Sequence, residues 1–253
     1  MGRSLAVALG VEALPGREWR SRLHPRAGDL VLLAVPDPAL AGLARELAAE
    51  RPPPGVAFVH LSGALGLDVL QPLRSSGSSV GSFHPLQSFP VERPARAFAG
   101  SLVAIEAGEP GLEAELEGLA RRLGAVPRVV PAEQRALYHA AAVLASNYLV
   151  ALAAQACATL EAAGWTRADA LGALLPLMRG VLENLEASGL PEALIGPIRR
   201  GDPATVERHL QALQGTGLPE RIYRILGLAA LELAREAGLD AAAGDRVKEA
   251  LTG

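Results

Sequence analysis

The sequence predicts an α/β domain built on a doubly wound parallel sheet, followed by an all-α domain. In residues 29–130, apolar strand-like runs alternate with helix-like segments, which is the pattern of repeated βαβ units. From Pro131 onward the sequence shows helical patterns only. A chain of 253 residues, half of them apolar, is long enough for two domains of ordinary size. We place the boundary near Val129, with domains at 1–128 and 129–253.

The strands of the first half are short apolar runs that end at turn residues. The first run, 29–35 (DLVLLAV), is continuous in Leu and Val, as expected for a strand buried on both faces, and Pro36 ends it. The segment 38–50 begins with a proline and repeats apolar residues at helical spacing, which predicts a helix. Further strands are expected at 56–61, 79–83, 101–107 and 126–130, with helices around LGLDVLQPL and LEAELEGLARRLG.

The helical half begins with one long apolar stretch from Pro131 to Gly164, where the glycine suits a helix C-cap. The stretch is longer than most globular helices and too apolar for solvent on all sides, so we expect a central helix. Asp202 and Pro203 predict an N-cap and a first helical residue, and Gly215 predicts a stop. Further helices are expected at about 167–187, interrupted by Pro176, and at 203–214, 219–237 and 241–251.

Composition argues against several classes of protein. The net charge of −3 and the scattered arginine pairs offer no basic surface for nucleic acid. No uninterrupted apolar run approaches the ~20 residues that cross a bilayer, and the N-terminus lacks a signal-peptide layout. The lone Cys157 excludes an internal disulfide and is interpreted as a small buried residue. We therefore expect a cytoplasmic protein that binds neither nucleic acid nor membrane.

Three polar clusters follow predicted strands at their carboxyl ends, where ligands bind in open parallel sheets. They are Val35-Pro36-Asp37, His60-Leu61-Ser62-Gly63 and His84-Pro85-Leu86-Gln87. Proline at position 85 favours extended backbone at His84, so that this ring leaves its strand towards the ligand side. Each cluster also has a structural explanation, either a turn with a helix cap or a hydrogen-bonded histidine at a strand end. Their recurrence at successive strand ends favours a site.

The long apolar helix carries a polar face. His139, Ser146 and Asn147 lie within a sector of about 100° at helical spacing. Buried polar groups require partners, so ordinary packing does not select these residue types in an otherwise apolar helix. They are interpreted as substrate-site residues, and the alternative is a hydrogen bond between helices or across a dimer interface.

Two further features concern anions and metals. The loop 196–202 places Arg199 and Arg200 between glycines ahead of a helix N-terminus, an arrangement that can clamp an anionic ligand. An ordinary solvated loop has the same composition. The five histidines include no pair at i, i+3 or i, i+4 and no HExxH motif, so a metal site is not expected.

Several motifs, taken in order, resemble one known family. LLAVPD, HLSGALG, GSFHPLQSF, LYHAAAVLASNYLVAL and GPIRRGDPATVERHL are similar to the Rossmann-like NADP-dependent oxidoreductases whose helical half is the domain of unknown function 2520. Wider relatives are pyrroline-carboxylate reductases, hydroxyisobutyrate-type dehydrogenases and prephenate dehydrogenases. The resemblance covers about residues 29–233. It implies a nucleotide-binding sheet domain, then a helical domain that forms a homodimer.

The resemblance also implies roles for individual residues. The nicotinamide side of an NADP cleft would be lined by Val35, Pro36, Asp37, Ser62 and Gly63. Catalysis would fall to His84 and His139 as acid or base, with Asn147 orienting the substrate. Substrate contacts would come from Gln87, Ser146, Arg199 and Arg200.

The N-terminal segment departs from the family pattern. A member is expected to open with a strand, a GxGxxG turn and a helix, whose glycines let the backbone approach a pyrophosphate. The sequence has no such turn, and residues 1–28 resemble the family's second helix and third strand. About 30 residues, one strand-helix-strand unit, are thus expected to be lacking. Either the start codon was assigned too far downstream or the turn was lost; alternatively, residues 5–9 form a replacement strand.

Two functions are compatible with these features. The first is an oxidoreductase that moves hydride between NADP(H) and a small carbonyl, imine or hydroxy acid in the cleft between the domains. The second is a non-catalytic dimer, a ligand-binding or degenerate protein without effective cofactor binding. The polar strand ends favour the first function, and the missing glycine-rich turn favours the second.

Overall fold

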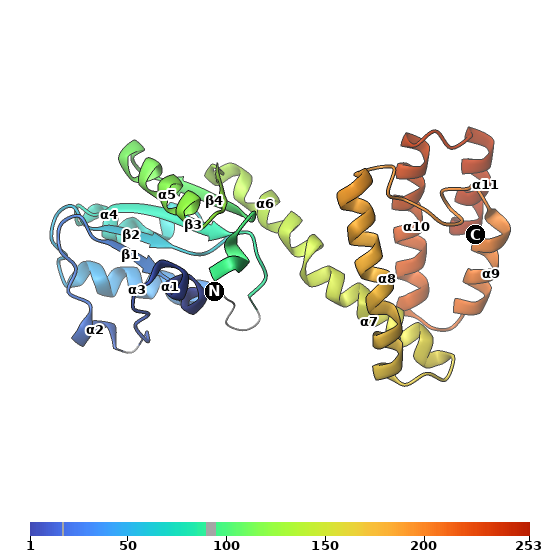
Figure 1. The fold of residues 1–253 in the computed structure, drawn as a ribbon, viewed down its shortest axis with the longest axis horizontal. Coiled ribbons are helices and arrows are strands. Elements are labelled where there is room, and N and C mark those ends of the chain that lie inside the picture. The colour runs from blue at the N-terminus through green and yellow to red at the C-terminus, as the bar shows by residue number, and fades with distance from the viewer. Residues whose placement is uncertain (17, 90–94) are drawn as a thin grey trace. The chain divides into compact units, whose positions relative to one another are not determined.

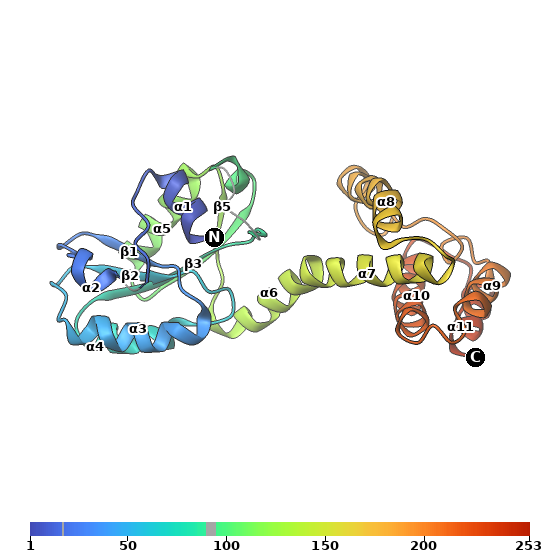
Figure 2. The same cartoon turned by 90° about the horizontal axis from the view of Figure 1, so that it is seen from below.

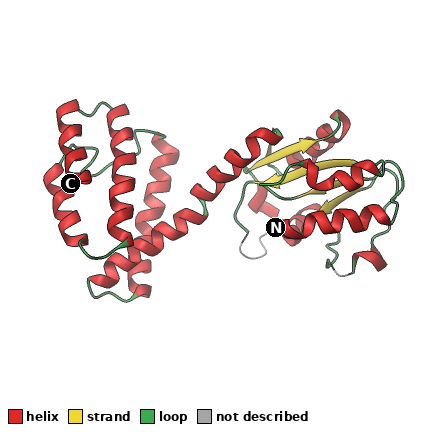
Figure 3. Ribbon diagram, turned by 180° about the vertical axis from the view of Figure 1, so that it is seen from behind, coloured by secondary structure: helices red, strands yellow, loops and turns green. Residues whose placement is uncertain are grey.

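The computed structural model describes residues 1–16, 18–89 and 95–253 (Figure 1). The chain forms two compact units, Met1–Ser146 and Asn147–Gly253. The first unit combines a sheet with helices, and the second is helical, which confirms the fold class predicted from the sequence. All strands belong to the first unit (Figure 3). This unit also includes helix α6 (Ala132–Ala145), which the sequence boundary near Val129 assigns to the helical half.

One five-stranded sheet organises the first unit. Its strands, in the order in which they lie side by side, are β1 (Leu30–Leu33), β2 (Ala57–His60), β3 (Ser79–Pro85), β4 (Leu102–Ala107) and β5 (Val126–Val129). The first three strands are parallel, and their register aligns Leu33 with His60 and His60 with Ser82. Their carboxyl ends therefore meet at one edge of the sheet.

The expected parallel arrangement is wrong at one position. β4 pairs with β3 in antiparallel orientation, and β5 is parallel to β4. A parallel return requires a crossover connection, usually a helix. Between β3 and β4, the described residues contain only the short η2 (Ala95–Phe98), so the chain reverses its direction there.

Helices cover both faces of the sheet (Figure 2). One face packs against α3 (Asp37–Ala49), η1 (Leu67–Leu70) and α4 (Gln71–Ser75) around the buried Phe58. The other face packs against α1 (Gly2–Leu9) and α5 (Pro110–Arg122) around Val59 and Phe83. Phe58 and Val59 are neighbours on β2 that point to opposite faces, as the pleat of a strand requires.

The N-terminal segment differs from both sequence expectations. Residues 5–9, the alternative replacement strand, belong to helix α1, which buries Leu5 and ends at Gly10 in a left-handed conformation with φ of 66°. Among the described residues ahead of β1, the chain forms α1 and the short α2 (Trp19–Arg22) and no strand. Leu5 packs on the core together with Met1, Ala8 and Leu9, and this spacing is that of one face of a helix rather than the alternation of a strand.

The long apolar stretch after Pro131 forms two helices, α6 and α7 (Asn147–Ala162), where the sequence predicts one. Ser146 lies between them, and its hydroxyl donates to the carbonyl of Ala142 at 2.6 Å, a back-bond that bends helices. Ala132–Ala162 is long and apolar enough to cross a membrane by length and composition, with a mean hydropathy of 1.5, and 6% of its apolar window is buried. The stretch contains polar and charged residues, so it includes no uninterrupted apolar run of about 20 residues, as expected from the sequence.

The second unit has its core among three helices. α9 (Pro203–Leu213), α10 (Leu218–Glu236) and α11 (Ala241–Thr252) enclose Val206, Leu210, Leu231, Val247 and Leu251. A Cβ on Gly227 would lie 2.5 Å from the Leu251 side chain, so α10 and α11 need a glycine at this close approach. Asp202 caps α9 as predicted. The helix α8 (Arg167–Ser188) continues through Pro176, which corrects the expected interruption.

Replacing Phe58 by alanine tests the core of the first unit. The side chain is fully buried between β2 and the helices α3 and α4. We expect Phe58→Ala to lower the free energy of unfolding by about 3–5 kcal/mol, because a cavity replaces the ring. Urea denaturation followed by circular dichroism measures this loss. Val7→Ala on the exposed side of α1 serves as the control, and an equal loss in both variants would contradict the assignment of the core.

Candidate functional site

The polar clusters predicted at the strand ends come together in the first unit. His60 is the last residue of β2, His84 lies near the end of β3, and Asp37 begins α3 after β1. His139 reaches the same edge from α6, since its ring lies 6.2 Å from that of His84 between centroids. The structure thus groups Asp37, Ser62, Gly63, His84 and His139 at the carboxyl ends of the parallel strands.

Hydrogen bonds fix the turn that follows β2. The Ser62 hydroxyl donates to Asp37 Oδ2 at 2.8 Å and accepts from the backbone N–H groups of Ala64 and Leu65 at 3.2 and 3.1 Å. The backbone N–H of Ser62 donates to His60 Nδ1 at 3.2 Å. The side chains of Ser62 and Asp37 therefore hold the β1 and β2 ends together, and the backbone of the turn faces the site.

Gly63 lies between two imidazole rings. A Cβ at this position would be 2.8 Å from His84 Nε2 and 2.9 Å from His139 Nδ1. Both distances are shorter than ordinary carbon contacts, so any side chain at position 63 would displace the rings. Gly63 thus allows both rings to approach its backbone closely, and His84 Nε2 and His139 Nδ1 lie near the same point beside it.

The imidazoles of His60 and His84 are neutral at neutral pH. Burial lowers the pKa of His60 to about 4, and the positive charge of Arg135 acts in the same direction. Burial also lowers the pKa of His84 to about 4, assisted by His139 and Arg135. Within the described part of the chain, His60 Nε2 and His139 Nδ1 are buried without a hydrogen-bond partner. Such atoms are available to a ligand.

Tyr138 is a site residue that the sequence interpretation missed. Its hydroxyl lies 2.8 Å from His84 Nδ1, and the two rings meet edge to face. Burial raises the pKa of Tyr138 to about 12, so that the phenol keeps its proton at neutral pH. Its position beside His139 in the sequence is the one available signal, and the contact itself depends on tertiary structure.

Arg135 was missed as well, although it is the largest fully buried side chain. Its Nε donates to Glu106 Oε2 at 2.6 Å, its Nη2 to Ser82 Oγ at 2.5 Å, and its Nη1 to the Ser62 carbonyl at 3.2 Å. A charged residue one helical turn ahead of Tyr138 and His139 is the sequence signal that marks it. Arg135 joins α6 to β3, β4 and the turn after β2.

The structure places the other predicted residues elsewhere or leaves their roles as predictions. Val35 and Pro36 lie at the partly exposed end of β1. Gln87 is exposed, and its amide donates to the Ala97 carbonyl at 3.3 Å. Asn147 begins α7 in the second unit. Its role in the site stays a prediction, as does that of Ser146.

The predicted anion loop is tied to its own unit. Arg199 donates to the Ala237 carbonyl at the end of α10, at 3.0 Å, which satisfies a free helix-terminal acceptor. Arg200 is exposed beside it. A substrate role for these two arginines remains a prediction. In the described ranges 1–16, 18–89 and 95–253, no group of three or more His, Cys, Asp or Glu side chains has an arrangement suited to a metal ion.

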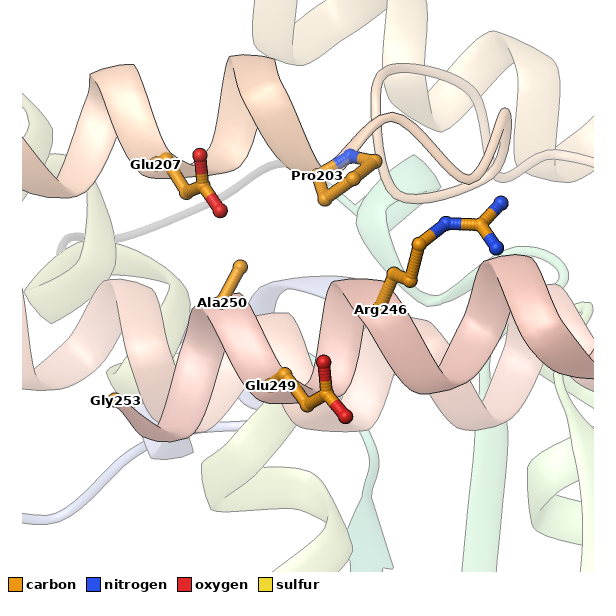
Figure 4. Close-up of a pocket in the computed structure, with 6 residues that line it drawn as sticks. All are labelled: Pro203, Glu207, Arg246, Glu249, Ala250 and Gly253. Atoms are coloured by element: carbon orange, nitrogen blue, oxygen red, sulfur yellow. The ribbon is translucent and has the colours of Figure 1, made fainter.

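The second unit contains two hollows. The smaller, of about 450 Å³, lies between α9 and α11, where Glu207, Glu249 and Arg246 surround it (Figure 4). The larger, of about 750 Å³, is an apolar groove lined by α7, α8, α9 and α10. The His209 ring and the Tyr223 hydroxyl meet at 2.8 Å in its wall. The first hollow has the mixed charges of a solvated surface, whereas the second lacks charged lining residues.

Comparison with known proteins agrees with the resemblance drawn from the sequence motifs. The model of DUF2520, a domain of unknown function, matches residues 101–230, and a Rossmann-like domain model matches residues 19–85. None of the curated proteins matches the sequence.

Solved structures share the fold. Protein TM1727 from Thermotoga maritima is 26% identical with a TM-score of 0.70, and the match covers 84% of this chain and 81% of that one. Protein BF3122 from Bacteroides fragilis, which bears the name of an NADP oxidoreductase, is 22% identical with a TM-score of 0.70 and coverages of 91% and 93%. The pyrroline carboxylate reductase of Plasmodium falciparum, solved with NADP bound, is 12% identical with a TM-score of 0.58 and coverages of 100% and 96%.

The depressed histidine pKa values predict a pH dependence of stability. The folded-state pKa of His60 is about 4 against 6.5 for an exposed histidine, so between these values the unfolded chain binds more protons. The free energy of unfolding should therefore fall as the pH drops from about 6.5 towards 4. His60→Asn, whose amide oxygen can still accept from Ser62, should weaken this dependence. Urea denaturation at several pH values measures it.

The exposed His24 provides the matched control for that experiment. His24→Asn should leave the pH dependence as in the wild type. If His60→Asn and the wild type lose stability in parallel between pH 6.5 and 4, the burial of a neutral imidazole at position 60 is not the cause.

Proposed function

The chain belongs to the DUF2520 family, whose model spans just over half of it, and from this premise we propose that it is an NAD(P)-dependent oxidoreductase acting on a small carbonyl, imine or hydroxy acid. One observation carries the proposal. His84 Nε2 and His139 Nδ1 both approach the backbone of Gly63 at the carboxyl ends of parallel strands, and burial keeps His84 neutral at neutral pH. In open sheets of this class, that edge is where nucleotides and their substrates bind.

The residues present fit the nicotinamide end of such a cofactor. Gly63 leaves room for the His84 and His139 rings where a Cβ would clash with them, and the Val35-Pro36-Asp37 segment, exposed at Pro36 and Asp37, lies at the same edge of the sheet. These residues, together with the turn at Ser62, would hold the nicotinamide portion. When bound, the cofactor supplies or accepts the hydride. The fit does not extend to the pyrophosphate, because the sequence has no GxGxxG turn to receive it.

The choice of NADP over NAD is a finer part of the proposal. It is supported by the name of the Bacteroides fragilis relative and by the NADP bound to the Plasmodium falciparum reductase. Hydride transfer to a carbonyl or imine leaves its oxygen or nitrogen in need of a proton. His84 or His139 would supply that proton and take it back in the reverse direction. Asn147 would orient the substrate.

The remaining predicted contacts complete the proposal. Gln87 and Ser146 would bind polar groups of the substrate, and Arg199 and Arg200 would bind its carboxylate. A second candidate is a non-catalytic ligand-binding protein, favoured by the lack of a GxGxxG turn within these 253 residues. The two candidates differ in whether a nicotinamide dinucleotide binds.

Titration with NADPH and NADH, followed by fluorescence, tests the proposed function. We expect binding, and turnover with a panel of small keto acids, cyclic imines and hydroxy acids. His84→Asn should lower kcat/KM by about 10²–10⁴-fold with little change in cofactor affinity, because it removes proton transfer and leaves the cofactor contacts. His24→Asn is the control. If neither dinucleotide binds at millimolar concentration, the non-catalytic candidate stands in place of the enzyme.

A homodimer formed through the second unit is the proposed assembly. The helices α7 and α8, both described along their whole length, bury few side chains. Cys157 is the one buried residue of α7, and Ala170 is the one buried residue of α8. Large apolar side chains on the exposed faces of α7, α8 and α10 include Val150, Leu152, Val181, Leu182, Ile225 and Leu226. Exposed apolar surface of this extent marks an interaction site. The unit carries both an apolar ridge and an apolar groove, as a two-fold interface between identical copies requires.

Aspartate substitutions on this face test the dimer. We expect the wild type to be a dimer by light scattering at micromolar concentration. Leu182→Asp combined with Leu226→Asp should shift it to a monomer with unchanged helicity, because both side chains are about half exposed in the single chain. Val7→Asp on α1 is the control. If the wild type is monomeric and co-sediments with lipid vesicles, the apolar face binds a membrane and not a second copy of the chain.

A further inference from the structure

We propose that Arg135 is a positioning residue of the site, whose guanidinium fixes the first turn of α6 on β3, β4 and the turn after β2 and thereby holds Tyr138 against His84. The hydrogen bonds that Arg135 donates do not reach the His84 ring. Its bonds run to Glu106 on β4, to Ser82 on β3 and to the carbonyl of Ser62 after β2.

The geometry of the guanidinium suits this role. A planar group with donors in a fixed fork can bind several acceptors at once, whereas a lysine ammonium acts as a point charge on a flexible stem. The Arg135 side chain is 1% exposed and that of Glu106 is 15% exposed, so the ion pair is shielded from water. A buried charge is tolerated only when such partners satisfy it. The position of the α6 N-terminal turn is therefore determined by contacts to three separate segments, which are β3, β4 and the turn after β2.

The next turn of α6 carries the residues that face the proposed ligand site. Tyr138 and His139 follow Arg135 by three and four residues, so all three share one face of α6. A small rotation or shift of α6 would move the Tyr138 hydroxyl away from His84 Nδ1, which it meets at 2.8 Å. Arg135 also binds the carbonyl next to Gly63, so it places the other wall of the same space.

In the proposed arrangement, the protonated Tyr138 phenol donates to Nδ1 of the neutral His84 ring, and the ring proton then resides on Nε2. Nε2 lies beside Gly63, where a ligand would meet it. The charged and titratable groups around His84 are His60 from β2, Asp37 from α3, and Arg135 and His139 from α6. Of these, Asp37 alone favours the protonated ring, and the other three oppose it.

Nitrogen NMR of the full chain labelled with ¹⁵N-histidine tests the proposal without any ligand. In the wild type at pH 7, His84 should show one tautomer, with the proton on Nε2 and a hydrogen-bonded Nδ1. Tyr138→Phe should lose this single-tautomer pattern. Arg135→Met combined with Glu106→Gln removes the buried pair together and should reproduce the Tyr138→Phe spectrum. Arg135→Lys should move the same resonances in the same direction by a smaller amount.

The surface pair Arg121 and Glu117 on α5 offers a matched control, since the arginine is 61% exposed. Arg121→Met with Glu117→Gln should leave the His84 resonances unchanged. The proposal is overturned if the Arg135 and Glu106 double variant is folded by circular dichroism and keeps the wild-type His84 pattern, because Arg135 then stabilises the unit without positioning the site. If the double variant does not fold, the Arg135→Lys spectrum takes its place. Shifted His84 resonances then support the proposal, and unchanged resonances overturn it. A wild-type His84 with its proton on Nδ1 also overturns it.

The catalytic consequence rests on the proposed function, and the NMR result does not. If the protein is an oxidoreductase, Arg135→Lys should lower kcat more than it raises KM, because the variant disturbs proton transfer rather than substrate affinity. If the protein shows no turnover but the His84 NMR pattern still depends on Arg135, the proposed function is wrong and the positioning role stands.

Discussion

The buried ion pair between Arg135 and Glu106 is the interaction on which the geometry of the site depends. It joins a helix to the edge of the sheet where the parallel strands end, and its remaining donors reach Ser82 and the Ser62 carbonyl. Removing one partner of such a pair costs about 3–5 kcal/mol, because the other charge is left buried and unpaired. This cost explains why α6 holds a defined position on the sheet, and why two histidines can be packed close to a glycine backbone.

The two units bury their side chains in different ways. The first has a core on each face of its sheet and places its unusual polar groups at one edge. The second encloses a core among α9, α10 and α11 but leaves α7 and α8 almost without buried side chains. Apolar helices of this kind gain stability by burying their exposed face against another surface. The proposed function of the first unit and the proposed dimer of the second therefore rest on separate physical features.

Much of the fold follows from local patterns. The run before Pro36 identifies β1 because continuous Leu and Val residues suit a strand covered on both faces, and Asp202 identifies the start of α9 because its carboxylate caps the backbone. The direction of β4 was not predictable in this way, since strand periodicity is the same in both orientations. The break at Ser146 was missed because a serine inside an apolar helix carries no strong stop signal.

For the site, the sequence by itself determined which strand ends are polar, and so it identified Asp37, Ser62, Gly63 and His84 before any contact was known. The tertiary structure alone decided how they meet and which residues join them. Tyr138 reaches His84 across 54 positions, and Arg135 reaches the Ser62 carbonyl across 73. Residue spacing indicates the periodicity of a single helix or strand. The partners of a buried charge come from distant segments that pack together, and this packing exists only in the folded chain.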